Sequence, residues 1–175
     1  YYTMNYDKYP FRRREMISFL IAVTVLFLLI GKLFFGTFLA GGLCIVFFPF
    51  LWKKKKKQLL EKRKKQLVKE FKDLILSFGA SLKAGYSIEN AFLEACRDLT
   101  YLYDASADIL QECQSMKRQM ENHISLEVLL NDLGERSRMT DIMDFAKVFA
   151  TAKKSGGDLN AMIANTADVI GQKIE

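Results

Sequence analysis

One apolar stretch constrains this chain more than any other feature: it runs from Met16 to Trp52, and Lys32 is its only charged residue. Five consecutive lysines follow it directly: Lys53, Lys54, Lys55, Lys56 and Lys57. A membrane span needs about 20 apolar residues. A single straight helix of this stretch would measure roughly 55 Å, well beyond a hydrocarbon core of about 30 Å. The sequence therefore predicts that the stretch breaks and crosses a membrane twice.

The predicted break lies at Gly31 and Lys32, and it divides the stretch into two helical arms, Met16–Ile30 and Leu33–Trp52. Basic residues flank both outer ends, with Arg12–Arg14 before the first arm and the lysine run after the second. Because basic residues prefer the cytoplasmic side, both clusters satisfy this preference only if the chain crosses an even number of times. One long tilted span or a re-entrant segment is the alternative. A cleaved signal peptide fits poorly, since no small-residue cleavage site follows.

The net charge of +6 averages two unlike halves of the chain. Residues 1–72 contain 16 Lys and Arg against 4 Asp and Glu, whereas residues 73–175 contain 10 against 16. Basic side chains beside a membrane are attracted to anionic headgroups, by about 1 kcal/mol each. We therefore expect the five lysines to lie at a membrane surface with anionic lipid as their partner. Nucleic acid is not expected, because Lys53–Lys65 adjoins the apolar stretch and lacks interleaved aromatic residues.

Residue types that hold metals or perform catalysis are sparse. Cys44, Cys96 and Cys113 lack metal-ligand spacing, and we expect the last two to be reduced core residues. The sequence contains no P-loop, dinucleotide-binding fingerprint or nucleophile elbow. Four acidic residues could pair for acid–base work or bind a divalent cation, but solvated helix faces explain them more simply. They are Glu89, Glu94, Asp141 and Asp144. We expect no enzyme, no cofactor and no metal site.

Beyond the apolar stretch, the sequence favours helices throughout. Residues 53–70 are strong helix formers and predict a basic stem that continues the second membrane arm. Residues 71–175 show helical periodicity with no sustained two-residue alternation, which predicts a bundle of about six helices. The expected fold is thus all-α: a cytoplasmic lead over residues 1–15, a transmembrane helical hairpin over 16–52, the stem, and a cytoplasmic bundle.

Capping and stop signals give the expected helix ends in the bundle. The first helix ends at Lys83-Ala84-Gly85, and Ser87 caps the second, so the two form a hairpin with a short turn. The later boundaries follow the same logic. Asp104 or Ser106 caps the third helix, Ser125 caps a fourth that ends at Gly134, Thr140 caps a fifth that ends at Ser155-Gly156-Gly157, and Asp158 caps a sixth.

The apolar positions at helical spacing predict the inward faces of these helices. In chain order they are Leu67, Phe71, Leu74, Ile75, Phe78 and Leu82; Ile88, Ala91, Phe92, Ala95 and Leu99; Ile109, Cys113, Met116 and Met120; Leu126, Leu129, Leu130 and Leu133; Ile142, Phe145, Ala146, Phe149 and Ala152; and Leu159, Met162, Ile163, Thr166, Val169 and Ile170. Gly156-Gly157 before a helix also suits anion binding in principle. A helix stop followed by an Asp158 cap explains it better, because that carboxylate would lie where an anion must bind.

Three motifs resemble the type II secretion system F domain. The stretch Ser81–Phe92, SLKAGYSIENAF, is similar to the family's first helical hairpin. Ser125–Leu130 is similar to its intervening leucine-containing helix, and Ala152–Leu159 to its glycine turn before the last helix. The three occur in the family's order over Phe71–Ile174. The membrane hairpin followed by a basic stem resembles the tight-adherence (Flp) pilus branch.

The resemblance implies a multi-pass platform protein of the inner membrane, in a pilus or secretion machine. Such a protein would hold the cytoplasmic assembly ATPase and help feed pilin subunits into the filament, and it would associate with itself or with related platform proteins. Family members usually continue into further spans after this domain, which would lie beyond Glu175. Different functions remain open: a membrane-anchored helical scaffold or sensor unrelated to secretion, or an enzyme with an unrecognised site.

Two sets of residues follow from these expectations. The acidic bundle suits a basic partner, which the resemblance implies is the ATPase, because complementary charges steer association. Its expected partner contacts are Glu89, Glu94 and Asp98. The residues expected to shape the turns are Gly85, Ser87, Gly156, Gly157 and Asp158.

Overall fold

The computed structural model describes the backbone of residues 41–155, the side chains of residues 53–155, and isolated positions outside that range. Those positions are 17, 18, 21, 22, 24–26, 29, 159, 161–163, 166 and 169. All regular structure within these residues is helical, and they contain no strand. The all-α prediction is confirmed for this part of the chain.

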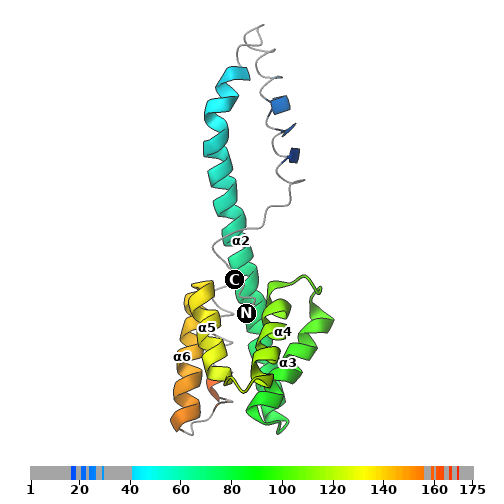
Figure 1. Cartoon of the computed structure of the whole chain (residues 1–175), viewed down its shortest axis with the longest axis vertical. Helices are drawn as coiled ribbons and strands as arrows, with labels where there is room; N and C mark the ends of the chain where they lie inside the picture. The colour runs from blue at the N-terminus through cyan, green and yellow to red at the C-terminus, as the bar shows by residue number, and fades with distance from the viewer. Residues whose placement is uncertain are drawn as a thin grey trace. The chain divides into compact units, whose positions relative to one another are not determined.

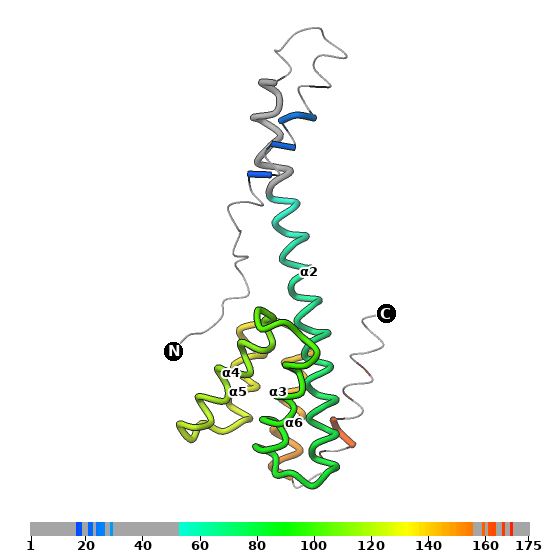
Figure 2. The backbone as a smooth tube through the Cα atoms, turned by 90° about the vertical axis from the view of Figure 1, so that its right-hand side faces the viewer, coloured from blue at the N-terminus to red at the C-terminus, as the bar shows by residue number. Residues whose placement is uncertain are grey.

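The helices of the described range follow one another along the chain (Figure 1). They are α2 (Gly41–Lys83), α3 (Ile88–Leu102), α4 (Asp108–Glu121), α5 (Leu126–Ser137) and α6 (Thr140–Ser155). The chain divides into two compact units, with a boundary inside α2 between Lys62 and Arg63. From Arg63 on, α2 belongs to the same unit as α3–α6, and Figure 2 shows its last turns beside α3. We call this unit the helical domain.

The core of the helical domain is built from the predicted apolar faces. Every member of those faces in α5 is buried, and the five from Leu67 to Phe78 in α2 are at most 2% exposed. Leu67 and Val68 belong to the core, so the buried face of α2 begins inside the predicted stem. Ile163 is also buried, but Val169 is 52% exposed, so its predicted inward position is wrong. Ile170 lies outside the described residues.

Five phenylalanines from three helices meet at the centre of this core. They are Phe71 and Phe78 of α2, Phe92 of α3, and Phe145 and Phe149 of α6. The rings of Phe71 and Phe145 are 5.4 Å apart in an edge-on arrangement, and Phe78 meets Phe92 in the same way at 5.9 Å. Such edge-on pairs contribute about 0.5–1.5 kcal/mol beyond the area they bury. Helix α6 is thus fixed to α2 by aromatic packing.

Gly134 does not end α5, contrary to the prediction. The helix continues to Ser137 and ends where Arg138 adopts a left-handed conformation, with φ of 54°. Gly134 is buried against α6, and a Cβ added to it would lie 3.0 Å from Cα of Met143. The glycine is there because the α6 backbone approaches α5 closely at this point. A glycine in the sequence signals either a stop or a close contact, and here it marks the contact.

Two predicted helix caps are also displaced. Helix α4 is capped by Ala107 rather than by Asp104 or Ser106. Asp104 instead accepts a hydrogen bond from the Ser106 amide at 2.9 Å, which forms a local turn before the helix. Thr140 is the first residue of α6 rather than its cap. Ser125 precedes α5 as predicted.

The predicted membrane hairpin falls mostly on residues outside the described part of the chain. The backbone of 41–52 is helical and forms the start of α2. Within the described residues, no helix combines the length and apolar character that a bilayer crossing requires. The hairpin over residues 16–52 stays a prediction.

Candidate functional site

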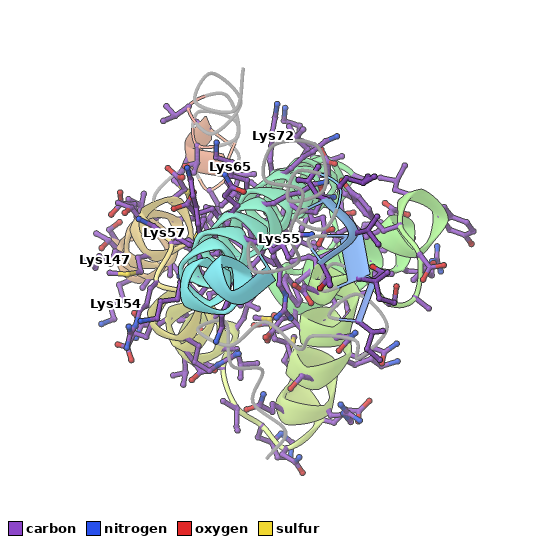
Figure 3. All side chains as sticks on the ribbon, turned by 90° about the horizontal axis from the view of Figure 1, so that it is seen from above. Lys55, Lys57, Lys65, Lys72, Lys147 and Lys154 are labelled. Atoms are coloured by element: carbon purple, nitrogen blue, oxygen red, sulfur yellow. The ribbon has the colours of Figure 1, made fainter. Side chains whose placement is uncertain are left out.

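The lysine run lies in the first half of α2, a helix that continues without interruption from Gly41 to Lys83. Consecutive residues of an α-helix are rotated by about 100°, so five in succession encircle the axis. Figure 3 shows Lys55 and Lys57 on opposite sides of α2. The run is therefore a basic collar around the helix; an amphipathic helix would have a one-sided stripe.

The five lysines of this basic collar differ in exposure. Four of the side chains are exposed to solvent, as a membrane-surface role requires, and they are those of Lys53, Lys54, Lys56 and Lys57. Lys55 is half-buried. Contact of the collar with anionic lipid stays a prediction.

The turn after α2 has the geometry that the sequence predicts. Gly85 has a φ of 91°, which side chains rarely adopt, and its amide donates to the Leu82 carbonyl at 3.0 Å. The amide of Tyr86 donates to the Ser81 carbonyl at 3.2 Å, and the two bonds form a Schellman motif. Ser87 then caps α3 by position, although its hydroxyl makes no capping hydrogen bond. The turn holds α2 and α3 antiparallel.

The second predicted turn, Gly156, Gly157 and Asp158, lies outside the described residues. Its flanks are described: α6 is described as far as Ser155, and Leu159 is helical. Ile163, which follows this turn, packs closely against α2 at Gly79. A Cβ added there would lie 2.8 Å from Cγ2 of Ile163.

The acidic residues expected to contact a partner do not gather on one face of the domain. All three lie on α3, where Glu94 is rotated about 140° and Asp98 about 180° from Glu89. Each has an intramolecular partner: Glu89 faces Lys153 at 3.4 Å, Glu94 pairs with Arg97, and Asp98 accepts a hydrogen bond from the Ser77 hydroxyl at 2.6 Å. Of the three, Glu89 is exposed to solvent, and the other two are half-buried.

A polar contact that sequence analysis missed fixes the N-terminus of α4 to α2. The guanidinium of Arg63 donates two hydrogen bonds to the carboxylate of Asp108, at 2.5 and 2.8 Å. Two helical turns further along α2, the Glu70 carboxylate accepts a hydrogen bond from the Ile109 amide at 3.3 Å. Glu70 thereby satisfies an amide that Ala107 cannot cap. Burial is the main cause that raises the pKa of Glu70, and hydrogen bonds from Gln66 and Ile109 oppose it.

A second missed contact joins α4 to α5. Arg136 donates to both carboxylate oxygens of Glu112 at 2.8 Å, and to Asp132 at 2.6 Å. Glu112 is only 2% exposed, so these charge-assisted bonds offset the desolvation of a buried carboxylate. The hydrogen bond to Glu112 is the largest cause that raises the pKa of Arg136. Sequence analysis missed Glu112 and Arg136 because each resembles an ordinary solvated charge, and no local pattern in the sequence indicates its distant partner.

Lys153 makes the corresponding contact from α6 to α5. Its ammonium lies 2.8 Å from a carboxylate oxygen of Glu127, and the hydrogen bond to Glu127 is the main cause that raises the pKa of Lys153.

Among the described residues, no three His, Cys, Asp or Glu side chains gather in a way that could hold a metal ion. Asp141 and Asp144, expected as solvated, are half-buried and exposed respectively.

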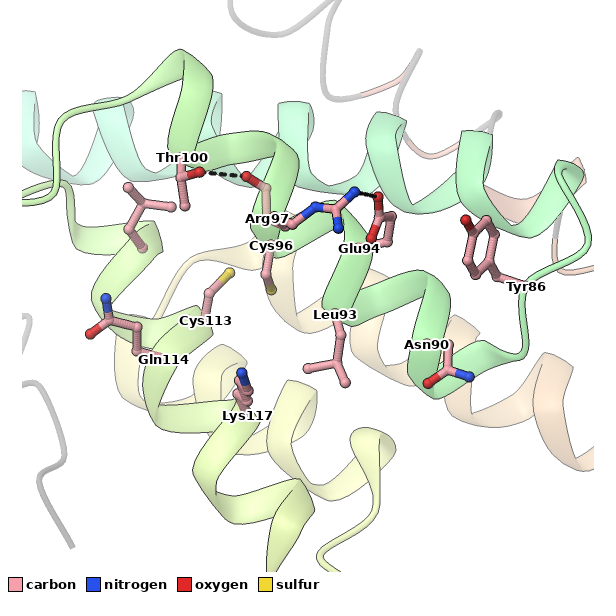
Figure 4. Close-up of a pocket in the computed structure, with 11 residues that line it drawn as sticks. Tyr86, Asn90, Leu93, Glu94, Cys96, Arg97, Thr100, Cys113, Gln114 and Lys117 are labelled. Atoms are coloured by element: carbon pink, nitrogen blue, oxygen red, sulfur yellow. Dashed lines mark hydrogen bonds and ion pairs between the residues drawn. The ribbon is translucent and has the colours of Figure 1, made fainter.

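A groove of about 510 Å³ lies between α3 and α4 (Figure 4). Its walls combine apolar side chains with polar ones at the rim, and Leu93, Cys96, Cys113 and Lys117 are among them. Both cysteines are free thiols, as predicted. Cys113 is buried and Cys96 is half-buried. The groove is the place where solvent approaches the two thiols of the domain.

Comparison of the chain with protein-family models, with curated proteins and with solved structures finds no match in any of the three. The resemblance to the type II secretion system F domain therefore stays an expectation, supported by the motifs in the sequence.

Proposed function

We propose that the chain is a platform protein of the inner membrane, which serves a pilus or secretion machine of the type II secretion or tight-adherence kind. The observation that carries the proposal is the continuity of α2. One helix contains the end of the apolar stretch, the basic collar and the first core face of the helical domain. An element of this kind suits a domain that is suspended from a membrane.

The basic collar supports the proposed position of this helix. Lysines distributed around the whole helix suit a helix that stands across the headgroup layer, where anionic lipid surrounds it on every side. A helix that lies flat on a membrane would instead have its lysines on one polar face. We therefore propose that the transmembrane hairpin over residues 16–52 places the collar at the cytoplasmic surface and the helical domain in the cytoplasm.

The proposed partners follow from the motifs and the charge. The helical domain would hold the assembly ATPase, and the membrane part would help pilin subunits enter the filament, in association with itself or with related platform proteins. The motif Ser81–Phe92 supports this, because its turn has the Schellman geometry around Gly85. The alternative is a membrane-anchored helical scaffold or sensor unrelated to secretion. A pilin and an ATPase encoded beside the gene would favour the platform, and a kinase or response regulator would favour the sensor.

A cysteine-accessibility map of the full chain in intact cells tests the topology. The native cysteines are replaced by alanine, and Lys32→Cys, Gln58→Cys and Ser106→Cys are introduced one at a time. Gln58 and Ser106 are exposed, so both are suitable reporters. We expect an impermeant maleimide to label only the position at Lys32 from outside. External labelling at Ser106 would contradict the proposal, because the domain would then lie on the other side from the ATPase.

Recruitment of the ATPase tests the partner. Glu89→Gln, Glu94→Gln and Asp98→Asn together remove three negative charges from α3. The matched control, Glu121→Gln, Glu135→Gln and Asp144→Asn, removes three from exposed positions elsewhere. We expect the first set alone to weaken binding of the purified ATPase at low salt, with a smaller effect at high salt because salt screens exposed charges. Equal effects of the two sets would contradict a contact on α3.

A further inference from the structure

Cys96 and Cys113 come from different helices and meet at the same groove. Cys96 lies on α3 and Cys113 on α4, and both line the groove between these helices. Figure 4 shows the two side chains turned toward each other across it. The neighbouring Cys96 thiol, followed by burial, raises the pKa of Cys113. Two free thiols therefore face each other at an opening to solvent.

The two cysteines differ in access, which suits an ordered reaction. Cys113 is 3% exposed, whereas Cys96 is half-buried and can be reached from the groove. A disulfide needs its sulfur atoms at about 2.05 Å, closer than two thiols in contact. Forming the bond therefore requires the two side chains to rotate and α3 to move toward α4. Both cysteines line the groove of about 510 Å³ between the two helices.

We propose that Cys96 and Cys113 form a dithiol–disulfide site, which a small disulfide such as glutathione disulfide oxidises reversibly and which then links α3 to α4. This site is independent of the proposed platform function. Thiol–disulfide exchange requires an accessible attacking thiolate and a second thiol that can resolve the mixed disulfide. Cys96 supplies the first and Cys113 the second.

The exchange takes two steps. The Cys96 thiolate attacks one sulfur of glutathione disulfide, so that a bond forms between Cys96 and glutathione and one glutathione thiol leaves. The Cys113 thiol then loses its proton and attacks the Cys96 sulfur, which forms the intramolecular disulfide and releases the second glutathione as a thiolate that takes up a proton. The protein gives up two electrons and two protons, and these reduce one glutathione disulfide to two thiols. Excess reduced glutathione or dithiothreitol reverses both steps.

The test uses the full chain in detergent with Cys44→Ser, so that only the pair can react. The protein is equilibrated with glutathione redox buffers, quenched with acid, unfolded and alkylated. Trypsin cuts after Arg97 and Lys117, which places the two cysteines in separate peptides, Ala84–Arg97 and Asp98–Lys117. We expect oxidation to abolish alkylation of both, to lower the mass by two hydrogen atoms, and to yield the two peptides joined. Dithiothreitol should restore both alkylation sites.

Single variants separate the roles of the two thiols. Cys113→Ser should stop at a glutathione adduct on Cys96, and Cys96→Ser should stay unmodified because Cys113 is buried. A second measurement avoids these variants: the oxidised chain should unfold at a higher urea concentration than the reduced chain, because the bond restricts the unfolded state. The proposal is overturned if both cysteines stay alkylatable in every oxidising buffer. It is also overturned if Cys96 ends as a stable glutathione adduct in the chain that keeps both thiols, or if the disulfide forms only between two chains.

Discussion

Helices α4 and α6 have similar lengths, 14 and 16 residues, but different interactions hold them in the helical domain. Helix α6 contributes Phe145 and Phe149 to the aromatic centre of the core. Helix α4 contributes only aliphatic and sulfur-containing side chains to the core, and ionic contacts from α2 and α5 hold it at Asp108 and Glu112. It also packs against α3, and the groove lies beside this contact.

The difference predicts which interactions each helix depends on. Aromatic packing at native density leaves little freedom, because any displacement of α6 opens a cavity. Ionic contacts hold α4 in direction and register, and a groove adjoins its contact with α3. We therefore expect α6 to depend on shape and α4 to depend on charge, and the following variants test this contrast.

We expect the largest loss of stability when a phenylalanine ring of α6 is removed. Phe145 is 2% exposed and touches both Phe71 and Phe149, so Phe145→Ala should lower the free energy of unfolding by about 4 kcal/mol. Val148→Ala is the matched control, because Val148 lies on the same helix and is 46% exposed; it should cost less than about 0.5 kcal/mol. Urea unfolding of the full chain in detergent, followed by circular dichroism, measures both. Equal costs would refute an aromatic anchor for α6.

The corresponding variant on the α4 side removes a charge. Arg136→Met takes away the two hydrogen bonds that Arg136 donates to buried Glu112, and should cost about 3 kcal/mol in the same unfolding experiment. Arg97→Met is the control, since Arg97 is exposed and pairs with Glu94 at the surface, where such pairs contribute about 0–1 kcal/mol.

The double variant Arg136→Met with Glu112→Met sharpens the result. Replacing a buried ion pair by apolar residues of similar size is often neutral, so we expect the double variant to recover much of the lost stability. If Arg136→Met costs no more than Arg97→Met, charge does not hold α4.

How much the sequence could predict differs between the same two helices. The apolar spacing of α6 placed Ile142, Phe145 and Phe149 inward, and all three are buried. Such spacing is a local property, so it can be recognised from the sequence alone. The ionic contacts of α4 join residues such as Arg63 and Asp108, which are 45 positions apart, and no local pattern connects them.

The candidate site shows the same division. The Gly85 turn depends on a backbone conformation that glycine favours, so a single residue predicts it. Gly134 was misread because the α6 backbone that contacts it can be identified only in the folded domain. Likewise, the three acidic residues of α3 gave no sequence signal of their intramolecular partners, such as Lys153 for Glu89.

The smallest expected effect concerns pH and the N-terminus of α4. Burial raises the pKa of Glu70 above its ordinary value of 4.5, with Asp108 and Asp73 adding to the rise. The folded domain therefore holds this proton more firmly than the unfolded chain does. The stability that this proton provides is fully present below pH 4.5 and is lost as the pH rises through the raised value. Ionised Glu70 thus destabilises the domain slightly at neutral pH.

Glu70→Gln removes this titration while keeping an oxygen that can accept the Ile109 hydrogen bond. We expect the variant to be more stable than the parent chain at pH 7, by a margin that shrinks as the pH falls toward about 4, where the parent carboxyl is protonated. Other carboxylates titrate in both chains, so the difference between the two unfolding free energies at each pH is the quantity to measure. Glu70→Ala is the control: it removes the acceptor and should be less stable than the parent across the range. A Glu70→Gln difference that is constant with pH would mean that the charge on Glu70 does not affect how α4 is held, and that hydrogen bonding alone fixes its N-terminus.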